Sequence, residues 1–287
     1  MHFPDHGEHG MHDQRVIYSN NSVLSDLSIN LNDYRTGTET IDYTLNQDYI
    51  FIGSFLPFNH KHIDISTAND VTSAITVSIW DGTTWNAAVD VIDRTSVGGK
   101  SLAQDGIISW STEITKTWAR QQKSTDVTGL SGTNIYNMYW VRFSFNATLK
   151  VTTALRYIGQ KFHDDDILYM YYPDLNNSSL KTSYLTGKTT WEDQAYIAAQ
   201  NIVSDLKKDE KLVSSDQILD FELFKQTSCH AAAMVIYWGL GQFEKHDKAK
   251  QKYDADFKKG FLRLDLNQDA NLEPIERVIS GAKYLTR

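Results

Sequence analysis

The sequence has a single cysteine, Cys229, among its 287 residues. One thiol cannot form an internal disulfide, so folding does not depend on an oxidising compartment. Cys229 lies in an apolar stretch beside His230, and adjacent positions of a helix point about 100 degrees apart. The pair therefore lacks the geometry of a nucleophile with its base, and we expect an inert core cysteine.

Long apolar runs and long runs of one charge are also missing. No apolar stretch reaches the roughly eighteen residues of a membrane span, and the start of the chain has no apolar signal core. We therefore expect a soluble protein, made in a cytoplasm and without a membrane partner. The net charge is −8, and the longest like-charge run is the carboxylate trio from Asp164 to Asp166. Without a basic field we expect no binding to DNA or RNA.

Catalytic signatures are missing as well. The sequence contains no glycine-rich phosphate loop, no His-Glu-x-x-His and no Gly-x-Ser-x-Gly. His60 and His62 would share one face of a strand, but no third metal ligand is identifiable, so we expect solvent-facing polar positions. Nothing in the sequence argues positively for the paired carboxylates of a glycosidase. We predict that the protein is not an enzyme.

The sequence does have enough apolar material for two cores, with 41% hydrophobic and 12% aromatic residues. From Tyr34 to about Tyr157, short alternating runs rich in β-branched and aromatic residues are separated by turn signals. The clearest runs are residues 49–53, 63–65, 75–80 and 139–145. No helical pattern lies between them, so they predict an antiparallel β-sandwich resembling a jelly roll.

After about residue 157 the apolar period becomes helical. Asp164 to Asp166 can cap a short helix that ends before Pro173. Further helices are predicted at residues 189–208, 216–239 and 244–264, and a last short one begins at Pro274. The run from Ala231 to Trp238 is apolar nearly all round, so its helix should lie at the centre of a helical bundle.

These patterns predict an α+β protein with two domains, an antiparallel β-sandwich at residues 34–160 and an α-helical bundle at residues 161–287. Residues 1–33 would form a partly flexible N-terminal arm. Its histidines could chelate a metal on one helical face, but Gly7 and Gly10 oppose a helix there. We therefore expect an arm that orders on contact with a partner. The histidines concerned are His2, His6, His9 and His12.

The most specific local pattern lies at residues 265–276. Counted from the first of these residues, side chains with oxygen occupy positions 1, 3, 5, 9 and 12, and predicted helices flank them, which is the ligand spacing of an EF-hand calcium loop. Ala270 replaces the glycine of the sharp turn, and a polar turn between two helices is the alternative. The candidate Ca²⁺ ligands are Asp265, Asn267, Asp269, Asn271 through its carbonyl, Glu273 and Glu276.

Several segments resemble tailed-bacteriophage virion proteins, whose β-sandwiches repeat a Trp-Asp-Gly turn followed by Trp and later a Gly-led strand ending in Trp. The matching segments are residues 52–59, 79–85, 90–95 and 105–110. The helical half is similar in layout to phage head-to-tail adaptor, or connector, proteins, which are small helical bundles around the portal. Together the two resemblances span roughly residues 45–287, and no catalytic residues come with them.

The resemblance implies a structural virion protein of the neck, assembled in the host cytoplasm. Such a subunit would form a homo-oligomeric ring, expected to be a dodecamer, that links the portal protein to tail, stopper or nozzle proteins. The alternative is a carbohydrate- or receptor-binding jelly-roll module of a phage tail or baseplate. In that case Trp85, Trp110 or Trp118 would stack on a pyranose, and Asp81 or Asn86 would hold its hydroxyls, unless the rings simply fill the core.

Overall fold

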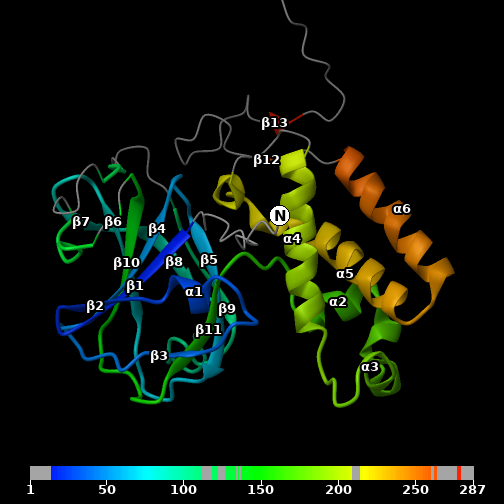
Figure 1. Ribbon diagram of the computed structural model, residues 1–287, viewed down its shortest axis with the longest axis horizontal. Helices are drawn as coiled ribbons and strands as arrows, with labels where there is room; N and C mark the ends of the chain where they lie inside the picture. Colours follow the sequence, from blue (N-terminus) through cyan, green and yellow to red (C-terminus); the bar gives the residue numbers. More distant parts are fainter. Residues whose placement is uncertain are drawn as a thin grey trace, which may run out of the picture. The chain divides into compact units, whose positions relative to one another are not determined.

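The structure, a computed structural model, describes residues 14–111, 118–121, 127–133, 135, 137–208 and 214–259, and the backbone of residues 262–263 and 277–278. The chain divides into two compact units, Met1–Gly159 and Gln160–Arg287. Antiparallel sheets make up the first unit and helices dominate the second (Figure 1). The prediction of an α+β chain with strands first and helices second is therefore confirmed.

The first unit contains two antiparallel sheets, with strand orders β2-β1-β4-β10-β6-β7 and β3-β11-β5-β9-β8. The first sheet consists of β1 (Gln14–Asn20), β2 (Val23–Asp26), β4 (Tyr49–Ser54), β10 (Tyr139–Phe145), β6 (Ile75–Trp80) and β7 (Trp85–Ala87). The second consists of β3 (Glu39–Thr40), β11 (Ala154–Gly159), β5 (His60–Thr67), β9 (Gly106–Ser111) and β8 (Val89–Asp93). The four runs singled out in the sequence lie in β4, β5, β6 and β10.

The two sheets share one apolar core. Along β10, Val141 and Phe143 point into this core while Trp140 and Arg142, one position away, lie on the other face, as the two-residue period of a strand requires. The second sheet contributes residues such as Ile63, Ile108 and Ile158 to the same cluster. The alternation in the sequence of β10 thus corresponds to a strand with two differently packed faces.

The outer face of the six-stranded sheet is also apolar. Phe51, Trp80 and Trp140 pack there in a second cluster, covered by Val127 and Leu130 from the long connection before β10. Gly53 belongs to this face, because a Cβ atom at that position would lie only 2.7 Å from the Trp140 ring. The sheet is consequently buried on two sides over part of its area.

The prediction of an N-terminal arm over residues 1–33 is wrong from residue 14 onward. Strand β1 pairs antiparallel with both β2 and β4, and a short helix α1 (Ser28–Leu31) follows. Val16 and Tyr18 enter the shared core, whereas Ile17 enters the outer cluster. Because β1 is apolar on both faces, it shows no alternation in the sequence, which is why its strand was missed.

The second unit contains five α-helices within the described ranges: α2 (Asp165–Tyr171), α3 (Ser178–Tyr184), α4 (Glu192–Lys208), α5 (Lys225–Gly239) and α6 (Phe243–Lys259). Helix α5 packs against both α4 and α6, which gives it the central place that its apolar sequence predicts. Asp164 caps α2, as predicted, because its side chain accepts a hydrogen bond from the Ile167 amide. No helix in the described part of the chain is long and apolar enough to cross a membrane.

The predicted start of the central helix at residue 216 is wrong, because α5 begins at Lys225. Two short 3₁₀ helices, η2 (Ser215–Gln217) and η3 (Phe221–Phe224), precede it, and a third, η1 (Pro173–Asn176), follows α2. Phe224 is fully buried and stacks on Phe162 at 5.4 Å between ring centroids. The 3₁₀ helices η2 and η3, with buried Phe224 in the second, thus occupy the positions expected for the first turns of the central α-helix.

The helices predicted on both sides of the calcium loop are not found at its ends. Helix α6 stops at Lys259 instead of 264, and β12 (Leu262–Arg263) pairs antiparallel with β13 (Arg277–Val278) where the last helix was expected. The sequence places Gly260 directly after two lysines, a combination typical of helix ends. The segment with the predicted calcium ligands is therefore flanked by two paired strands and not by two helices.

Candidate functional site

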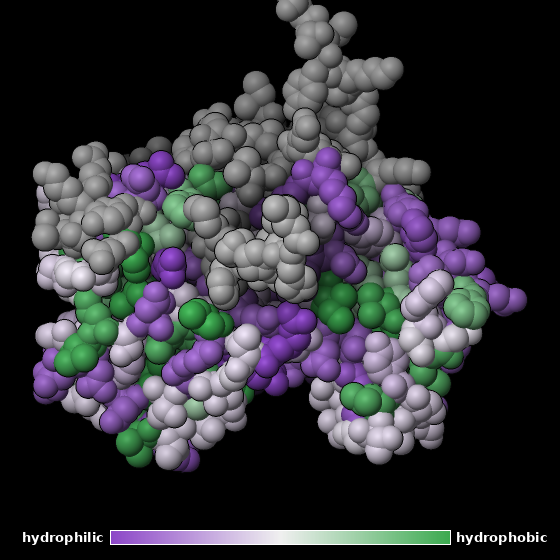
Figure 2. Space-filling model, in the orientation of Figure 1, coloured by the Kyte–Doolittle hydropathy of each residue, from purple (hydrophilic) through white to green (hydrophobic). Residues whose placement is uncertain are grey.

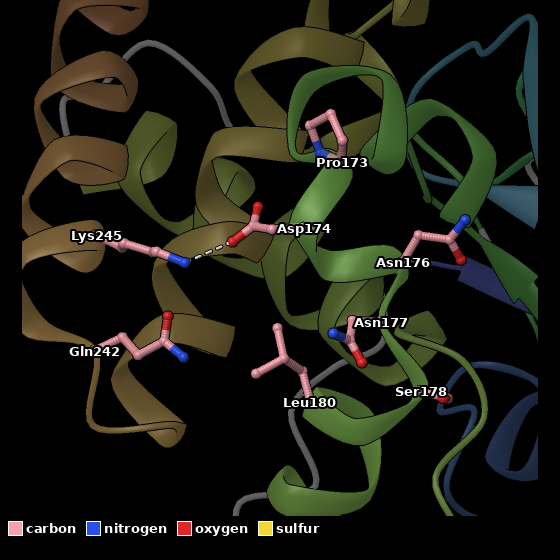
Figure 3. A pocket seen from close by; sticks show the side chains of 8 residues that line it. All are labelled: Pro173, Asp174, Asn176, Asn177, Ser178, Leu180, Gln242 and Lys245. Carbon is pink, nitrogen blue, oxygen red and sulfur yellow. Dashed lines mark hydrogen bonds and ion pairs between the residues drawn. The ribbon is translucent and has the colours of Figure 1, made fainter.

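A surface pocket of about 630 Å³ in the helical unit is the first candidate site (Figure 3). Its wall comes from the η1–α3 segment on one side and from the α5–α6 turn and the first turn of α6 on the other. The residues that line it are Pro173, Asp174, Asn176, Asn177, Ser178, Leu180, Gln242 and Lys245.

Asp174 connects the two sides of this pocket. Its carboxylate accepts hydrogen bonds from Tyr237 Oη at 2.9 and 3.1 Å and from Lys245 Nζ at 2.7 Å. Burial alone would raise the pKa of Asp174, but the hydrogen bonds from Lys245 and Tyr237 outweigh it and lower that pKa. Burial, together with Asp174, in turn raises the pKa of Tyr237. The carboxylate is thus ionised at neutral pH and ties α5 and α6 to η1.

The remaining pocket wall is polar and contains one unsatisfied acceptor. Asn177 caps α3, because its side-chain oxygen accepts from the Ser179 amide at 2.8 Å. Gln242 directly precedes α6, and its carbonyl accepts hydrogen bonds from the amides of Lys245 and His246. The buried Oε1 atom of Gln242, however, has no hydrogen-bond partner in the described part of the chain. A pocket of this kind can take up a donor group from a bound molecule.

An exposed aromatic cluster, the aromatic tip, lies at the α5–α6 turn and consists of Trp238, Phe243 and His246. Trp238 is 62% exposed and Phe243 is 57% exposed, and their ring centroids are 5.3 Å apart. The His246 ring lies 5.2 Å from that of Trp238. Gly241, at φ +67°, supports the reversal of the chain between the two helices. The central helix α5 thus ends in an exposed tryptophan, although its sequence is apolar nearly all round up to that residue.

Further apolar side chains are exposed elsewhere in the helical unit. On α2, Met170 is 80% exposed and Tyr171 is 41% exposed, and Leu185 after α3 is 60% exposed. Figure 2 shows hydrophobic side chains at the surface among hydrophilic ones. Single exposed apolar residues are common, but a neighbouring Trp and Phe that are both more than half exposed are typical of an interaction surface.

The potential nucleophiles of the helical unit are buried. Cys229 is fully buried, and burial raises the pKa of its thiol to about 12, so it stays protonated at neutral pH. His163 Nδ1 lies 2.7 Å from Ser228 Oγ, but both residues are inaccessible, and burial lowers the pKa of His163 to about 3. A Ser–His pair without access to solvent cannot act on a substrate. Cys229 has the place in the core that the sequence predicts.

The histidine pair of β5 does not face solvent, contrary to expectation. His60 is 2% exposed and His62 is 7% exposed. The His60 ring nitrogen Nδ1 lies 2.8 Å from Asn59 Oδ1, and His62 Nε2 lies 2.5 Å from the buried carboxylate of Asp64. Each buried ring has a polar partner one or two residues away in the sequence, which satisfies the hydrogen-bonding potential of its nitrogen.

Of the three tryptophans predicted to stack on a sugar, Trp110 is buried and Trp85 and Trp118 are partly buried. Trp110 is only 2% exposed and belongs to the shared core, so it cannot stack on a pyranose. Trp85 remains partly exposed, and its Nε1 donates to the Thr128 carbonyl at 2.9 Å. Asn86 donates to Asp81 at 2.6 Å, which occupies both groups assigned to sugar hydroxyls. Trp118 packs against the shared core.

All six predicted calcium ligands lie outside the described residues, as do the four N-terminal histidines. The ligands are Asp265, Asn267, Asp269, Asn271, Glu273 and Glu276. Sequence reasoning missed both the polar pocket and the aromatic tip. The signal for the tip was present, since Trp238 and Phe243 flank a turn with two glycines.

The second candidate site lies on the outer face of the six-stranded sheet, where Arg142 is stacked between two rings. Its guanidinium carbon lies 4.5 Å from the Tyr49 ring centroid and 5.0 Å from that of Trp85. Burial lowers the pKa of Arg142, and its Nε atom is buried without a hydrogen-bond partner. No carboxylate in the described part of the chain forms an ion pair with it.

Comparison of the chain with protein-family models, with curated proteins and with solved structures finds no match.

Proposed function

We propose that the chain is a non-enzymatic structural subunit of a tailed-phage virion, which forms a ring at the head-tail junction and links the portal protein to the tail. The observation that carries this proposal is the aromatic tip. The resemblance of the sequence to phage virion and adaptor proteins supplies the place in the particle. The occupant of the tip is a second copy of the chain.

Ring formation requires two different surfaces on one subunit, because a head-to-tail contact joins unlike patches. The helical unit offers exposed apolar side chains on two different parts: Trp238 and Phe243 at the aromatic tip, and Met170 and Tyr171 on α2. Trp is among the residues that contribute most to interfaces, typically at least about 2 kcal/mol when fully buried. The tip of one copy would pack on α2 of the next.

The polar pocket supports the same arrangement. It is formed in part by Gln242 and Lys245, which lie beside Phe243 on the same turn. An interface with an apolar centre and a polar rim is typical of protein assemblies. A donor from the neighbouring copy would satisfy Gln242 Oε1, which is buried without a partner among the described residues. The tip and the pocket would thus form the centre and the rim of one contact.

The finer fold assignment is part of this proposal. The chain passes from one sheet to the other after β2, β3, β4, β5, β7, β9 and β10, so consecutive strands repeatedly lie in opposite sheets. This crossing pattern, with a core between the sheets, supports a jelly-roll β-sandwich. The central place of α5 between α4 and α6 supports a helical bundle for the second unit.

The test is the oligomeric state of the purified full-length chain, measured by native mass spectrometry over a range of concentrations. We expect a closed ring for the wild type and smaller species for Trp238→Ser combined with Phe243→Ser. Leu185→Ser is the matched control, because Leu185 is 60% exposed in the same unit but lies outside the aromatic tip and α2. This control should retain the ring.

The proposal fails if the wild type stays monomeric at every concentration, or if the tip variant assembles like the control. Imaging of the assembled particle tests the location. A subunit found on the capsid shell or at the distal end of the tail, instead of at the neck, would refute the place proposed here.

A further inference from the structure

We propose that the outer face of the six-stranded sheet carries a binding site for an acidic saccharide, centred on the guanidinium of Arg142, which would bind the sugar carboxylate. This site is independent of the aromatic tip and goes beyond the structural role proposed above.

The first argument is the state of Arg142. A partly buried cation normally pairs with a carboxylate, because removing it from water is otherwise costly. Arg142 has only ring contacts in the described part of the chain, to Tyr49 and Trp85, and its buried Nε has no partner. Contacts of a guanidinium with aromatic rings do not use its N–H donors, so these donors remain for a ligand.

The second argument is the chemistry around the guanidinium. In the ladder, Arg142 is paired with Ser78 of β6, and Ser144, two residues further along β10, is paired with Thr76. These residues share the outer face with Arg142, because side chains two positions apart on a strand point the same way. The hydroxyls of Ser144 and Thr76 make no side-chain hydrogen bond within the described ranges. The face therefore combines one fixed cation with free hydroxyls and an aromatic edge.

The ligand class follows from this combination. A sugar carries hydroxyls for Ser144 and Thr76 and an apolar ring face that packs on Trp85, and a uronate adds the planar carboxylate that an arginine binds through two parallel hydrogen bonds. The other arginine on this face, Arg15, pairs with Asp26 at 3.2 Å. One free cation suits a singly charged carboxylate better than a multiply charged phosphate or sulfate chain.

The neighbouring surface leaves space for the ligand. Thr76 and Ala87 are exposed, whereas Trp140 and Trp80, one row further along the sheet, are buried beneath the connection before β10. The open part of the face is therefore the part that contains Arg142. Trp85 lies at the border between the two parts, so its indole reports on binding.

The experiment is a titration of the full-length protein with oligoglucuronate, followed by tryptophan fluorescence and by calorimetry. A neutral oligoglucan of equal length and acetate serve as the two comparison ligands. We expect the uronate to bind at least about tenfold more tightly than either comparison ligand, which corresponds to one charge-assisted contact.

Variants locate the site. Arg142→Gln should lose the preference for uronate over neutral glucan, and Arg142→Lys should weaken binding although it keeps the charge, because lysine lacks the planar fork. Arg15→Gln is the matched control, since it removes an arginine from the same sheet face, and should bind like the wild type. Ser144→Ala removes one of the two free hydroxyls and leaves the rings beside Arg142 in place. This variant should weaken uronate binding but not acetate binding.

Three outcomes overturn the proposal: equal affinity for uronate and neutral glucan, acetate binding as tight as uronate binding, or full uronate binding by Arg142→Gln. If Arg142→Gln does not fold, Ser144→Ala and the comparison ligands still decide the question. None of these results depends on ring formation, so a failure here is distinguishable from a failure of the structural proposal.

Discussion

Acidification should destabilise the helical unit through one buried histidine. His163 is 4% exposed, its Nδ1 atom contacts Ser228, and its Nε2 atom has no partner in the described part of the chain. Burial, with a smaller contribution from the nearby Lys161 charge, lowers the pKa of His163 from 6.5 to about 3. The folded protein therefore holds this ring neutral where the unfolded chain would protonate it.

The magnitude follows from the two pKa values. Because the unfolded chain binds the proton first, the free energy of unfolding falls as the pH drops below 6.5, and the fall ends at about pH 3. Each pH unit in this window removes about 1.4 kcal/mol. At pH 5 the loss is about 2 kcal/mol, a large part of the stability of an ordinary domain. Above pH 6.5 the contribution of His163 to stability is fully present.

The assay is urea unfolding of the full-length chain at pH 7 and pH 5, followed by circular dichroism at the helical wavelength. We expect the difference between the two pH values to be about 2 kcal/mol smaller in His163→Gln than in the wild type.

An equal pH dependence in His163→Gln and the wild type would refute this reasoning. If the variant does not fold, the ring can be observed directly in the wild type by NMR. Its carbon shifts should show no protonation between pH 7 and pH 4.5, well above the folded pKa of about 3. A midpoint near 6 would show that burial does not hold this ring neutral.

Three further predictions concern other parts of the chain. Gly53→Ala should destabilise the sheet unit by about 1–3 kcal/mol in thermal unfolding, because the new Cβ would lie 2.7 Å from Trp140. Tyr237→Phe should cost about 1 kcal/mol, the usual contribution of one hydrogen bond, here to Asp174. If residues 265–276 bind calcium, a concentration a hundred times the dissociation constant should add about 2.7 kcal/mol, and Glu276→Gln should abolish this gain. A wild-type melting temperature indifferent to calcium and to chelator would show a simple polar turn.

Sequence patterns located the strands whose two faces differ. In β10, Val141 and Phe143 alternate with partly exposed Arg142 and Ser144, so the inner face could be recognised. Strand β1 could not be found in this way, because both of its faces are buried. Asp164 ahead of α2 was recognisable, since capping depends on residues within one turn.

The candidate sites were harder to predict, because they depend on residues distant in sequence. Asp174 and Lys245 belong to different elements, and no sequence pattern near either residue indicates that they form an ion pair. Arg142 can be recognised as a candidate binding residue only when the pairing of the strands has brought Tyr49 and Trp85 next to it. The exposure of Trp238 could not be inferred from hydrophobicity, since an apolar residue near a helix end is equally compatible with core and surface.

The strand orders also constrain how the first unit folds while the chain is being synthesised. Strand β10 inserts between β4 and β6, and β11 inserts between β3 and β5, although both follow their neighbours by many residues in sequence. Until β10 and β11 leave the ribosome, β4, β5 and β6 each present an unpaired edge to solvent. A nascent chain released before Tyr139 would lack both closing strands, and one released between β10 and β11 would still lack β11. In either case unpaired strand edges could recruit other chains, so the first unit is protected from aggregation only after translation has passed Gly159.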